Sequence, residues 1–126
     1  RDWIHVADHC RALEMLLAAD SAAVDGEIFN IAGGNERNIL EIADVILGTL
    51  DRPNSLIQYV TDRPGHDRRY ALAADKIRAR TGFVPEIAFE EGLPATVRWY
   101  VENEWWWRPI KSGQYRQYYE RMYGSP

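Results

Sequence analysis

The sequence predicts an α/β fold in which strands and helices alternate along the chain. Three observations support this prediction for the 126 residues. Short β-prone apolar segments alternate with longer segments. In the longer segments apolar residues recur every three or four positions. Glycine, proline or asparagine separates most neighbouring segments. This alternation is typical of βαβ units, and 46% hydrophobic with 27% charged residues is typical of a folded globular domain.

The first quarter of the chain contains two predicted strands around one predicted helix. Residues 2–6 form the first β-prone segment. Residues 8–19 are expected to be helical because their apolar side chains recur at one-turn spacing. The members of this stripe are Ala12, Leu13, Leu16 and Leu17. Residues 27–32 are a short apolar segment that Gly33 and Gly34 end, so we expect a second strand there.

A second helix is predicted to begin at Asn38, because Asn38 and Glu41 have the spacing of a capping box. Pro53 marks its end. Residues 56–60 then form a third predicted strand, and residues 69–72 are expected to be a short fourth one. The order of these elements repeats the strand, helix and strand alternation of the first quarter.

The last third of the chain is predicted to be mainly helical. Residues 75–81 form a short helix that Gly82 closes, and residues 90–104 form a longer one with a proline in its first turn. Three consecutive tryptophans follow at residues 105–107, and on a helix they point in three directions, so at least one is exposed or packs on a partner. We expect a final helix over residues 114–123.

Composition excludes several classes of function. A net charge of −4 provides no basic field for nucleic acid. Cys10 is the single cysteine, which excludes an internal disulfide, and His5, His9 and Cys10 lack the spacing of a metal site. With no apolar run of about 18 residues we expect no membrane contact and a cytoplasmic location. The chain opens with Arg1 inside a predicted strand, so we expect it to be part of a longer protein.

Residues 62–70, which we call the arginine turn, combine three arginines, one histidine, two aspartates and one tyrosine around Pro64 and Gly65. A Pro-Gly turn keeps the backbone open, and guanidinium groups bind phosphate in bidentate geometry. Arg63 and His66 could therefore meet at one phosphate group. The alternative is a solvated loop held by local ion pairs. In either case Arg68 and Arg69 are expected to hold the turn by pairing with Asp62 or Asp67.

Four motifs together resemble the C-terminal part of the dTDP-glucose 4,6-dehydratases, which are extended short-chain dehydrogenases. They are Arg1-Asp2-Trp3-Ile4-His5-Val6, Phe29-Asn30-Ile31-Ala32-Gly33, the arginine turn, and Lys111-Ser112-Gly113-Gln114-Tyr115. The resemblance implies short strands from the edge of a Rossmann sheet plus a small mixed α/β substrate-binding domain. It implies that residues 1–126 are the C-terminal substrate-binding portion, and that residues 1–36 include a strand and a helix that pack on a missing NAD-binding domain.

The resemblance also implies a reaction for the parent enzyme, a lyase. NAD oxidises the sugar at C4, water is eliminated across C5 and C6, and the hydride returns to C6. In that family the NAD lies on an N-terminal Rossmann domain with a three-glycine fingerprint and a Tyr-x-x-x-Lys pair, and this sequence contains neither. We therefore expect no catalytic, cofactor-binding or metal-binding residue here, no NAD bound to this chain, and no activity from the chain alone.

By motif match to the same family, five residues are expected to contact the nucleotide diphosphate of the substrate. They are Arg1, Asn38, Arg63, His66 and Tyr123. Three of them also have a structural interpretation: Asn38 as a helix cap, His66 as a hydrogen-bonding turn residue, and Tyr123 as a packing residue. The tryptophans at residues 105–107 are assigned to packing.

Two other functions remain open from the sequence. One is another sugar-nucleotide enzyme of the same superfamily, such as a UDP-sugar epimerase or decarboxylase. The other is a non-catalytic binding or oligomerisation module, in which the arginine turn is structural. The expected partners are a dTDP-sugar, the missing N-terminal Rossmann domain and a second copy of the chain. A second copy is expected because the predicted strand at 27–32 has bare edges.

Overall fold

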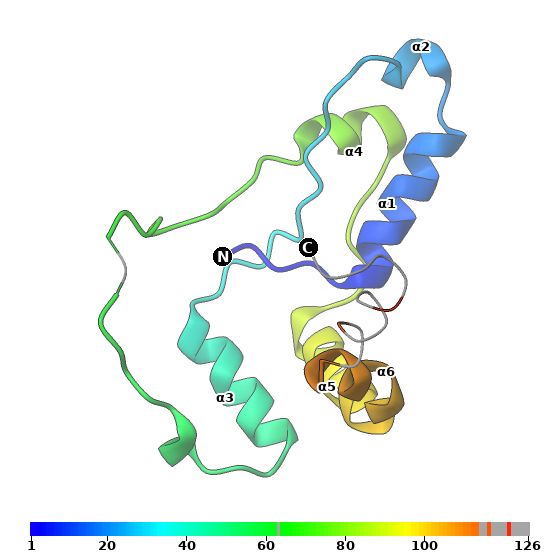
Figure 1. The fold of residues 1–126 in the computed structure, drawn as a ribbon. Helices are drawn as coiled ribbons and strands as arrows, with labels where there is room; N and C mark the ends of the chain where they lie inside the picture. Colours follow the sequence, from blue (N-terminus) through cyan, green and yellow to red (C-terminus); the bar gives the residue numbers. More distant parts are fainter. Residues whose placement is uncertain (63, 114–115, 117–120, 122–126) are drawn as a thin grey trace.

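The structure is a computed structural model that describes residues 1–62, 64–113, 116 and 121. Figure 1 shows the chain as short helices joined by extended segments. In the described part there are six α-helices and one 3₁₀-helix. They are α1 (Val6–Ala18), α2 (Ser21–Val24), α3 (Ile39–Thr49), η1 (Asn54–Leu56), α4 (Asp75–Thr81), α5 (Phe89–Glu102) and α6 (Glu104–Lys111).

Two helix ends follow local sequence signals closely. The side chain of Asn38 accepts hydrogen bonds from the backbone N–H groups of Leu40 and Glu41 at 3.0 Å each, and the Glu41 carboxylate accepts from Asn38 N at 2.8 Å. This completes the predicted capping box of α3. Gly82 closes α4 in the left-handed conformation, with φ +75°. The helices predicted at 8–19, 75–81 and 90–104 are confirmed to within a few residues. The helix predicted at 114–123 falls mostly outside the described residues.

The four predicted strands are wrong for the chain as the structure has it. Residues 2–6, 27–32, 56–60 and 69–72 form no strand, and the described part contains one isolated antiparallel bridge, between Asp2 and Glu36. The reason is physical: β-propensity favours an extended backbone, but a strand also needs a second backbone that takes its N–H and C=O groups. Residues 56–60 and 69–72 lie in the long connection between α3 and α4 (Figure 1), and residues 27–32 pack on the core through Phe29 and Ile31 without a paired strand.

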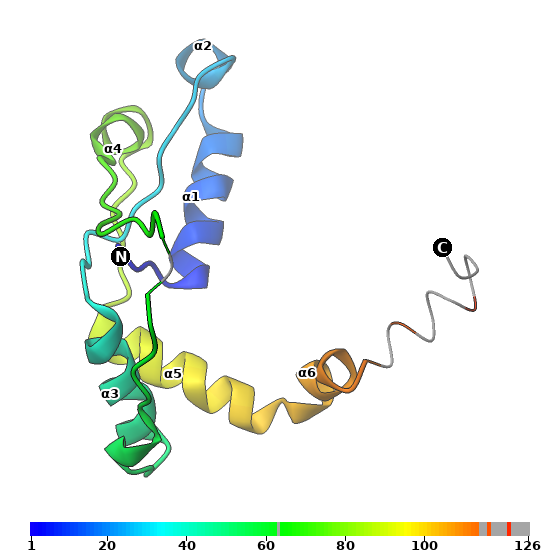
Figure 2. The ribbon, with the colours of Figure 1, turned by 60° about the vertical axis from the view of Figure 1, so that its left-hand side comes forward.

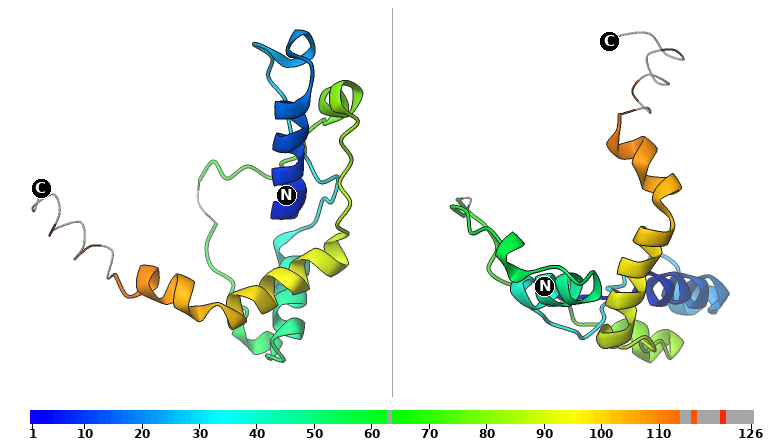
Figure 3. Two further views of the ribbon diagram at one scale, coloured as in Figure 1. Left: turned by 90° about the vertical axis from the view of Figure 1, so that its right-hand side faces the viewer. Right: turned by 90° about the horizontal axis from the view of Figure 1, so that it is seen from below.

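A small core joins α1 to α4. Ala12, Ile77 and Phe83 are fully buried and in contact, and they come from α1, α4 and the segment after α4. Around them pack Ile4, Met15, Leu16, Phe29, Ile31 and Ala74. The other group of helices is α3 packed on α5, with α6 continuing from α5 as an arm that leads away from α1 and α4 (Figures 2 and 3).

Aromatic rings hold α5 against α6. Trp99 forms edge contacts with Tyr100 and Trp106, with ring centroids 5.2 and 5.6 Å apart. Trp105 is 70% exposed, which confirms that one of the three consecutive tryptophans points to solvent. Within the described ranges, no helix has both the length and the apolar composition needed to cross a bilayer.

One buried carboxylate connects α1 to the start of α5. Asp8 is 2% exposed and accepts hydrogen bonds from the backbone N–H groups of Glu86 and Ile87 at 2.9–3.1 Å. Arg11 donates to the same carboxylate at 2.9 Å. Burial raises the pKa of Asp8, but these hydrogen bonds and the Arg11 charge together outweigh it, so the pKa lies below its ordinary value.

The segment around residue 35 lies against the first residues of the chain. Trp3 N donates to Asn35 O at 3.1 Å, and Arg37 N donates to Arg1 O at 3.0 Å. Gly33 permits this approach, because a Cβ there would lie 2.0 Å from the backbone oxygen of Trp3. The pairing fixes where the backbone of Arg1 lies relative to Arg37.

Candidate functional site

The arginine turn folds back onto the first residue of the chain. Arg1 Nη2 lies 2.9 Å from His66 Nε2, although the two residues are 65 positions apart in sequence. The guanidinium carbon of Arg1 also lies over the ring of Tyr70, 4.3 Å from the ring centroid. A guanidinium that stacks on an aromatic face directs its N–H donors outward along its edge. The structure thus brings two of the five predicted residues, Arg1 and His66, into direct contact.

The hydrogen bonds of His66 define its tautomer. Asp62 Oδ1 lies 2.7 Å from His66 Nδ1, and Arg1 occupies Nε2. A guanidinium has only donors, so Nε2 must accept, and the imidazole proton must sit on Nδ1, from which it is donated to Asp62. The His66 side chain is 37% exposed, so a ligand can reach it from solvent.

A bidentate ion pair anchors the arginine turn to the segment around residue 35. Arg69 Nε and Nη2 donate to the two carboxylate oxygens of Glu36 at 2.6 and 2.7 Å. The hydrogen bond from Arg69 holds the pKa of Glu36 below its ordinary value, and Glu36 in turn raises the pKa of Arg69. Because Glu36 also forms the bridge with Asp2, the ion pair holds the turn beside Arg1.

The expected local ion pairs within the turn are wrong for Arg69. Its carboxylate partner is Glu36 rather than Asp62 or Asp67. Asp62 instead bonds His66, and Asp67 accepts a hydrogen bond from the Tyr70 hydroxyl, which raises the pKa of Tyr70. The physical reason is that Asp62 and Asp67 are already bonded within the turn, whereas the fold places both carboxylate oxygens of Glu36 within reach of the guanidinium.

Of the three other residues predicted to contact the nucleotide, the structure describes only Asn38. Asn38 follows Arg37, whose backbone pairs with Arg1, so it lies next to the same region of the chain. Its side-chain oxygen is occupied by the two N–H groups of the α3 cap. Arg63 and Tyr123 lie outside the described residues, so their assignment stays a prediction.

Sequence reasoning missed two residues of this region, Tyr70 and Glu36. Tyr70 ends the arginine turn, and an aromatic residue next to several arginines is a signal that could have suggested stacking. Glu36 carries no such signal, because its role arises only when residue 69 is brought to it from 33 positions away.

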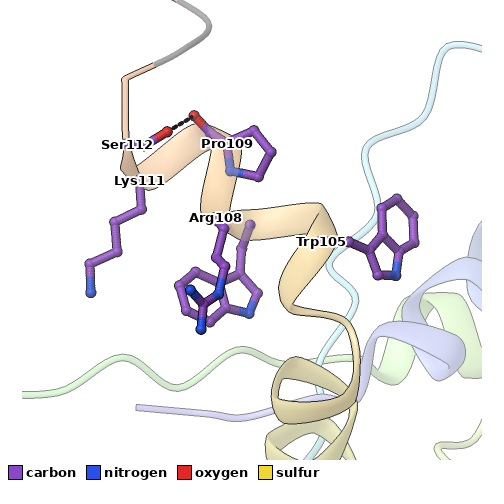
Figure 4. A pocket seen from close by; sticks show the side chains of 6 residues that line it. Trp105, Arg108, Pro109, Lys111 and Ser112 are labelled. Atoms are coloured by element: carbon purple, nitrogen blue, oxygen red, sulfur yellow. Dashed lines mark hydrogen bonds between the residues drawn. The ribbon is translucent and has the colours of Figure 1, made fainter.

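Two hollows lie elsewhere in the described part. One, of about 670 Å³, lies between residues 3–6 and the inner face of α5 and is lined mainly by apolar side chains. The other, of about 620 Å³, is on α6, where Trp105, Trp107, Arg108 and Lys111 surround an open surface (Figure 4). Both cations also lie near the Trp107 ring. Figure 2 shows α6 well away from the first residue, so this second hollow is separate from the arginine turn.

Similarity to solved structures assigns the fold to the α/β class. One is the dTDP-glucose 4,6-dehydratase of Bacillus anthracis strain Ames in complex with NAD, with a TM-score of 0.73 and 42% identity over 87% of this chain and 34% of that one. Another is DesIV of Streptomyces venezuelae, a dTDP-glucose 4,6-dehydratase solved with NAD bound, with a TM-score of 0.78 and 42% identity. That match covers 87% of this chain and 33% of the other.

Sequence comparison narrows this class to one family. The model of the GDP-mannose 4,6 dehydratase family matches residues 1–96, and the chain belongs to this family. It is 46% identical over 112 residues to the dTDP-glucose 4,6-dehydratase of Streptomyces niveus, covering 89% of this chain and 32% of the relative. For the enzyme of Xanthomonas campestris pv. campestris strain B100 the identity is 42% over 125 residues, covering 92% and 35%. The chain thus spans about a third of these relatives.

The described residues of this chain do not fit NAD. The adjacent glycines are Gly33 and Gly34, and the space beside Gly33 is filled by the backbone of Trp3 rather than open to a phosphate. Neither glycine starts a helix, so the arrangement lacks the helix N-terminus on which a dinucleotide pyrophosphate lies. In the part of the chain that the structure describes, no three metal-ligating side chains come together either.

Proposed function

We propose that this chain is the nucleotide-binding part of a dTDP-glucose 4,6-dehydratase, and that the arginine turn and Arg1 hold the diphosphate of the dTDP-sugar. The observation that carries the proposal is the contact between Arg1 and His66 across 65 residues of sequence, beside the Tyr70 ring. Two nitrogen-bearing side chains at one exposed edge, one of them stacked on an aromatic face, are suited to a charged diphosphate.

The other predicted residues complete this proposal. Arg63 precedes the Pro-Gly turn and adds a second guanidinium, while Asn38 and Tyr123 contact the nucleotide. Asn38 can do so through its amide N–H₂ group, because its oxygen serves the α3 cap. Arg69 is not part of this contact, since its Nε and Nη2 atoms donate to the carboxylate of Glu36.

The parent protein then carries out the dehydration with a cofactor that other residues hold. NAD held by those residues would supply the oxidation and the returned hydride that convert dTDP-glucose to dTDP-4-keto-6-deoxy-glucose and water. This chain contributes binding and orientation of the nucleotide end, and alone it turns over no substrate. The similarity to dTDP-glucose 4,6-dehydratases over most of the chain supports this division of roles.

Residues 1–36 are proposed to pack on the NAD-binding domain of the parent. Large apolar side chains on this part are exposed: Val6 is 67%, Leu17 88% and Ile28 83% accessible. Such side chains normally lie against another surface when they form a contiguous patch. Self-association of the isolated chain through the same residues stays a prediction, which analytical ultracentrifugation can measure.

Calorimetric titration of the chain with dTDP tests the nucleotide site. Arg1→Ala and His66→Ala should each weaken binding roughly tenfold to a hundredfold, because a charge-assisted hydrogen bond contributes about 1.5–3 kcal/mol. Arg52→Ala is the matched control, since Arg52 is an exposed arginine beyond the far end of α3. UDP and GDP should bind more weakly than dTDP. A preference for UDP would favour an epimerase or decarboxylase, and no binding by a chain with a helical circular dichroism spectrum would favour a non-catalytic module.

A further inference from the structure

We propose that nucleotide binding at the arginine turn takes up one proton, on Nε2 of His66, and that Asp62 is the positioning residue that makes this uptake necessary. The inference rests on the proposed function, because it concerns the same diphosphate. It goes further by assigning the charge state in which the site binds its ligand and a residue that controls this state.

The first step is the state of His66 before the ligand arrives. Nδ1 donates to Asp62 at 2.7 Å and Nε2 accepts from Arg1 at 2.9 Å. In this arrangement the imidazole is neutral, since each ring nitrogen has one defined role and only Nδ1 carries hydrogen. One N–H donor of Arg1 is therefore bonded to the lone pair on His66 Nε2.

The second step is what a diphosphate requires. Its oxygens are acceptors, so a contact with His66 requires hydrogen on Nε2, and Arg1 is released to donate to the phosphate as well. Asp62 keeps its hold on Nδ1–H throughout, because an ionised carboxylate can only accept. With hydrogen on both nitrogens the ring is an imidazolium, and the additional proton comes from solvent.

A bound diphosphate changes the surroundings of His66 in favour of the imidazolium. Arg1 faces Nε2, Asp62 faces Nδ1, and Asp67 and Arg68 follow His66 along the chain. On the opposite segment Glu36 and Arg69 neutralise each other. Tyr70 is a further titratable neighbour among the described residues, bonded to Asp67 and stacked on Arg1. A bound diphosphate adds negative charge and withdraws Arg1 from Nε2, and both changes favour the imidazolium.

The test is calorimetric titration with dTDP at pH 7.5 in two buffers of different ionisation enthalpy, which counts the protons taken up per nucleotide bound. The wild-type chain should take up close to one proton more than Asp62→Asn. The amide introduced by Asp62→Asn can donate to Nδ1, so in that variant a neutral ring with hydrogen on Nε2 can face the phosphate. Asp67→Asn is the matched control, because it removes the same charge next to His66 without touching the ring.

The pH dependence gives a second readout. Affinity of the wild-type chain should rise as pH falls from 8 to 6, by up to about tenfold per pH unit for one linked proton, and Asp67→Asn should follow it. The profile of Asp62→Asn should be flatter. Because dTDP contributes the same proton exchange to every variant, the differences between variants report the protein alone.

The outcomes separate this inference from the function on which it rests. If the wild-type chain binds dTDP but takes up no more protons than Asp62→Asn, the inference is wrong and the proposed function stands. If no variant binds dTDP while circular dichroism shows the helices intact, both are overturned. Equal loss of uptake in Asp62→Asn and Asp67→Asn would also overturn the inference, since general charge rather than the His66 tautomer would then be responsible.

Discussion

Two carboxylates of this chain, Asp8 and Asp62, show how differently the core and the arginine turn use charge. Asp8 is 2% exposed and receives two backbone N–H groups and a guanidinium, so its partners are part of the fold. The side chain of Asp62 is 76% exposed and bonds a histidine whose other nitrogen holds an arginine. The first arrangement can change only if the fold opens, whereas the second can exchange partners with a ligand.

The largest effect is expected from a substitution that disrupts the backbone pairing between the first residues of the chain and the segment around residue 35. Gly33→Ala would place a methyl group 2.0 Å from the backbone oxygen of Trp3, and backbone cannot move aside without loss of the pairing near Asn35. We expect a loss of about 3 kcal/mol or more in the free energy of unfolding, measured by urea denaturation. Gly48→Ala is the control, since nothing lies within 4 Å of its added methyl group, and it should be neutral or stabilising by about 0.5–1 kcal/mol. Equal effects of the two substitutions would contradict this account.

The next largest effect on the free energy of unfolding is expected at the buried carboxylate of Asp8, compared with the exposed carboxylate of Asp44. Asp8→Asn should lower the free energy of unfolding by about 2 kcal/mol, because an amide cannot accept from Glu86, Ile87 and Arg11 in the same way. Asp44→Asn, on α3 and outside the buried cluster, should change it by less than about 0.5 kcal/mol. Chemical denaturation of the two variants measures the difference, and a large effect of Asp44→Asn would argue against it.

The same carboxylate predicts the acid sensitivity of the fold. The pKa of Asp8 is lower in the folded chain than its ordinary value of 3.8, so its contribution to stability is fully present above that value. The contribution is lost as pH falls from about 4 through the lowered pKa. Unfolding followed from above that value into stronger acid should therefore show a steeper loss of stability for the wild type than for Asp8→Asn. Parallel curves for the two proteins would contradict the assignment.

A smaller effect is expected where exposed ion pairs position the turn. Glu36→Gln should weaken dTDP binding roughly twofold to fivefold by releasing Arg69, with little change in unfolding. Glu27→Gln removes an exposed ion pair of the same length, 2.6 Å, with Lys76, and it should leave dTDP affinity unchanged. Calorimetry on the two variants makes the comparison, and equal affinities would show that the Glu36 pair does not position the site.

The smallest effect concerns the stacking of Arg1 on Tyr70. Tyr70→Phe keeps an aromatic ring under the guanidinium and should bind dTDP nearly as well as the wild type. Tyr70→Leu keeps bulk but loses the ring, and it should weaken binding roughly twofold to fourfold in the same calorimetric titration. If Tyr70→Phe is the weaker binder of the two, the hydroxyl bonded to Asp67 matters more than the ring.

By itself, the sequence determined the four helices α1, α3, α4 and α5 to within a few residues, because those signals act over one or two turns. The capping box at Asn38 and Glu41 and the left-handed Gly82 needed no distant partner and were predicted correctly. The resemblance identified the family and two residues, Arg1 and His66, that the structure places in contact.

The tertiary structure alone decided which extended segments pair and which side chains meet. Strands at 27–32 and 56–60 were predicted and are absent from these described segments, because propensity sets the shape of a backbone but supplies no neighbour for it. The partners Glu36 of Arg69 and Arg1 of His66 lie 33 and 65 positions away. Such contacts depend on the path of the whole chain, and no local pattern in the sequence encodes that path.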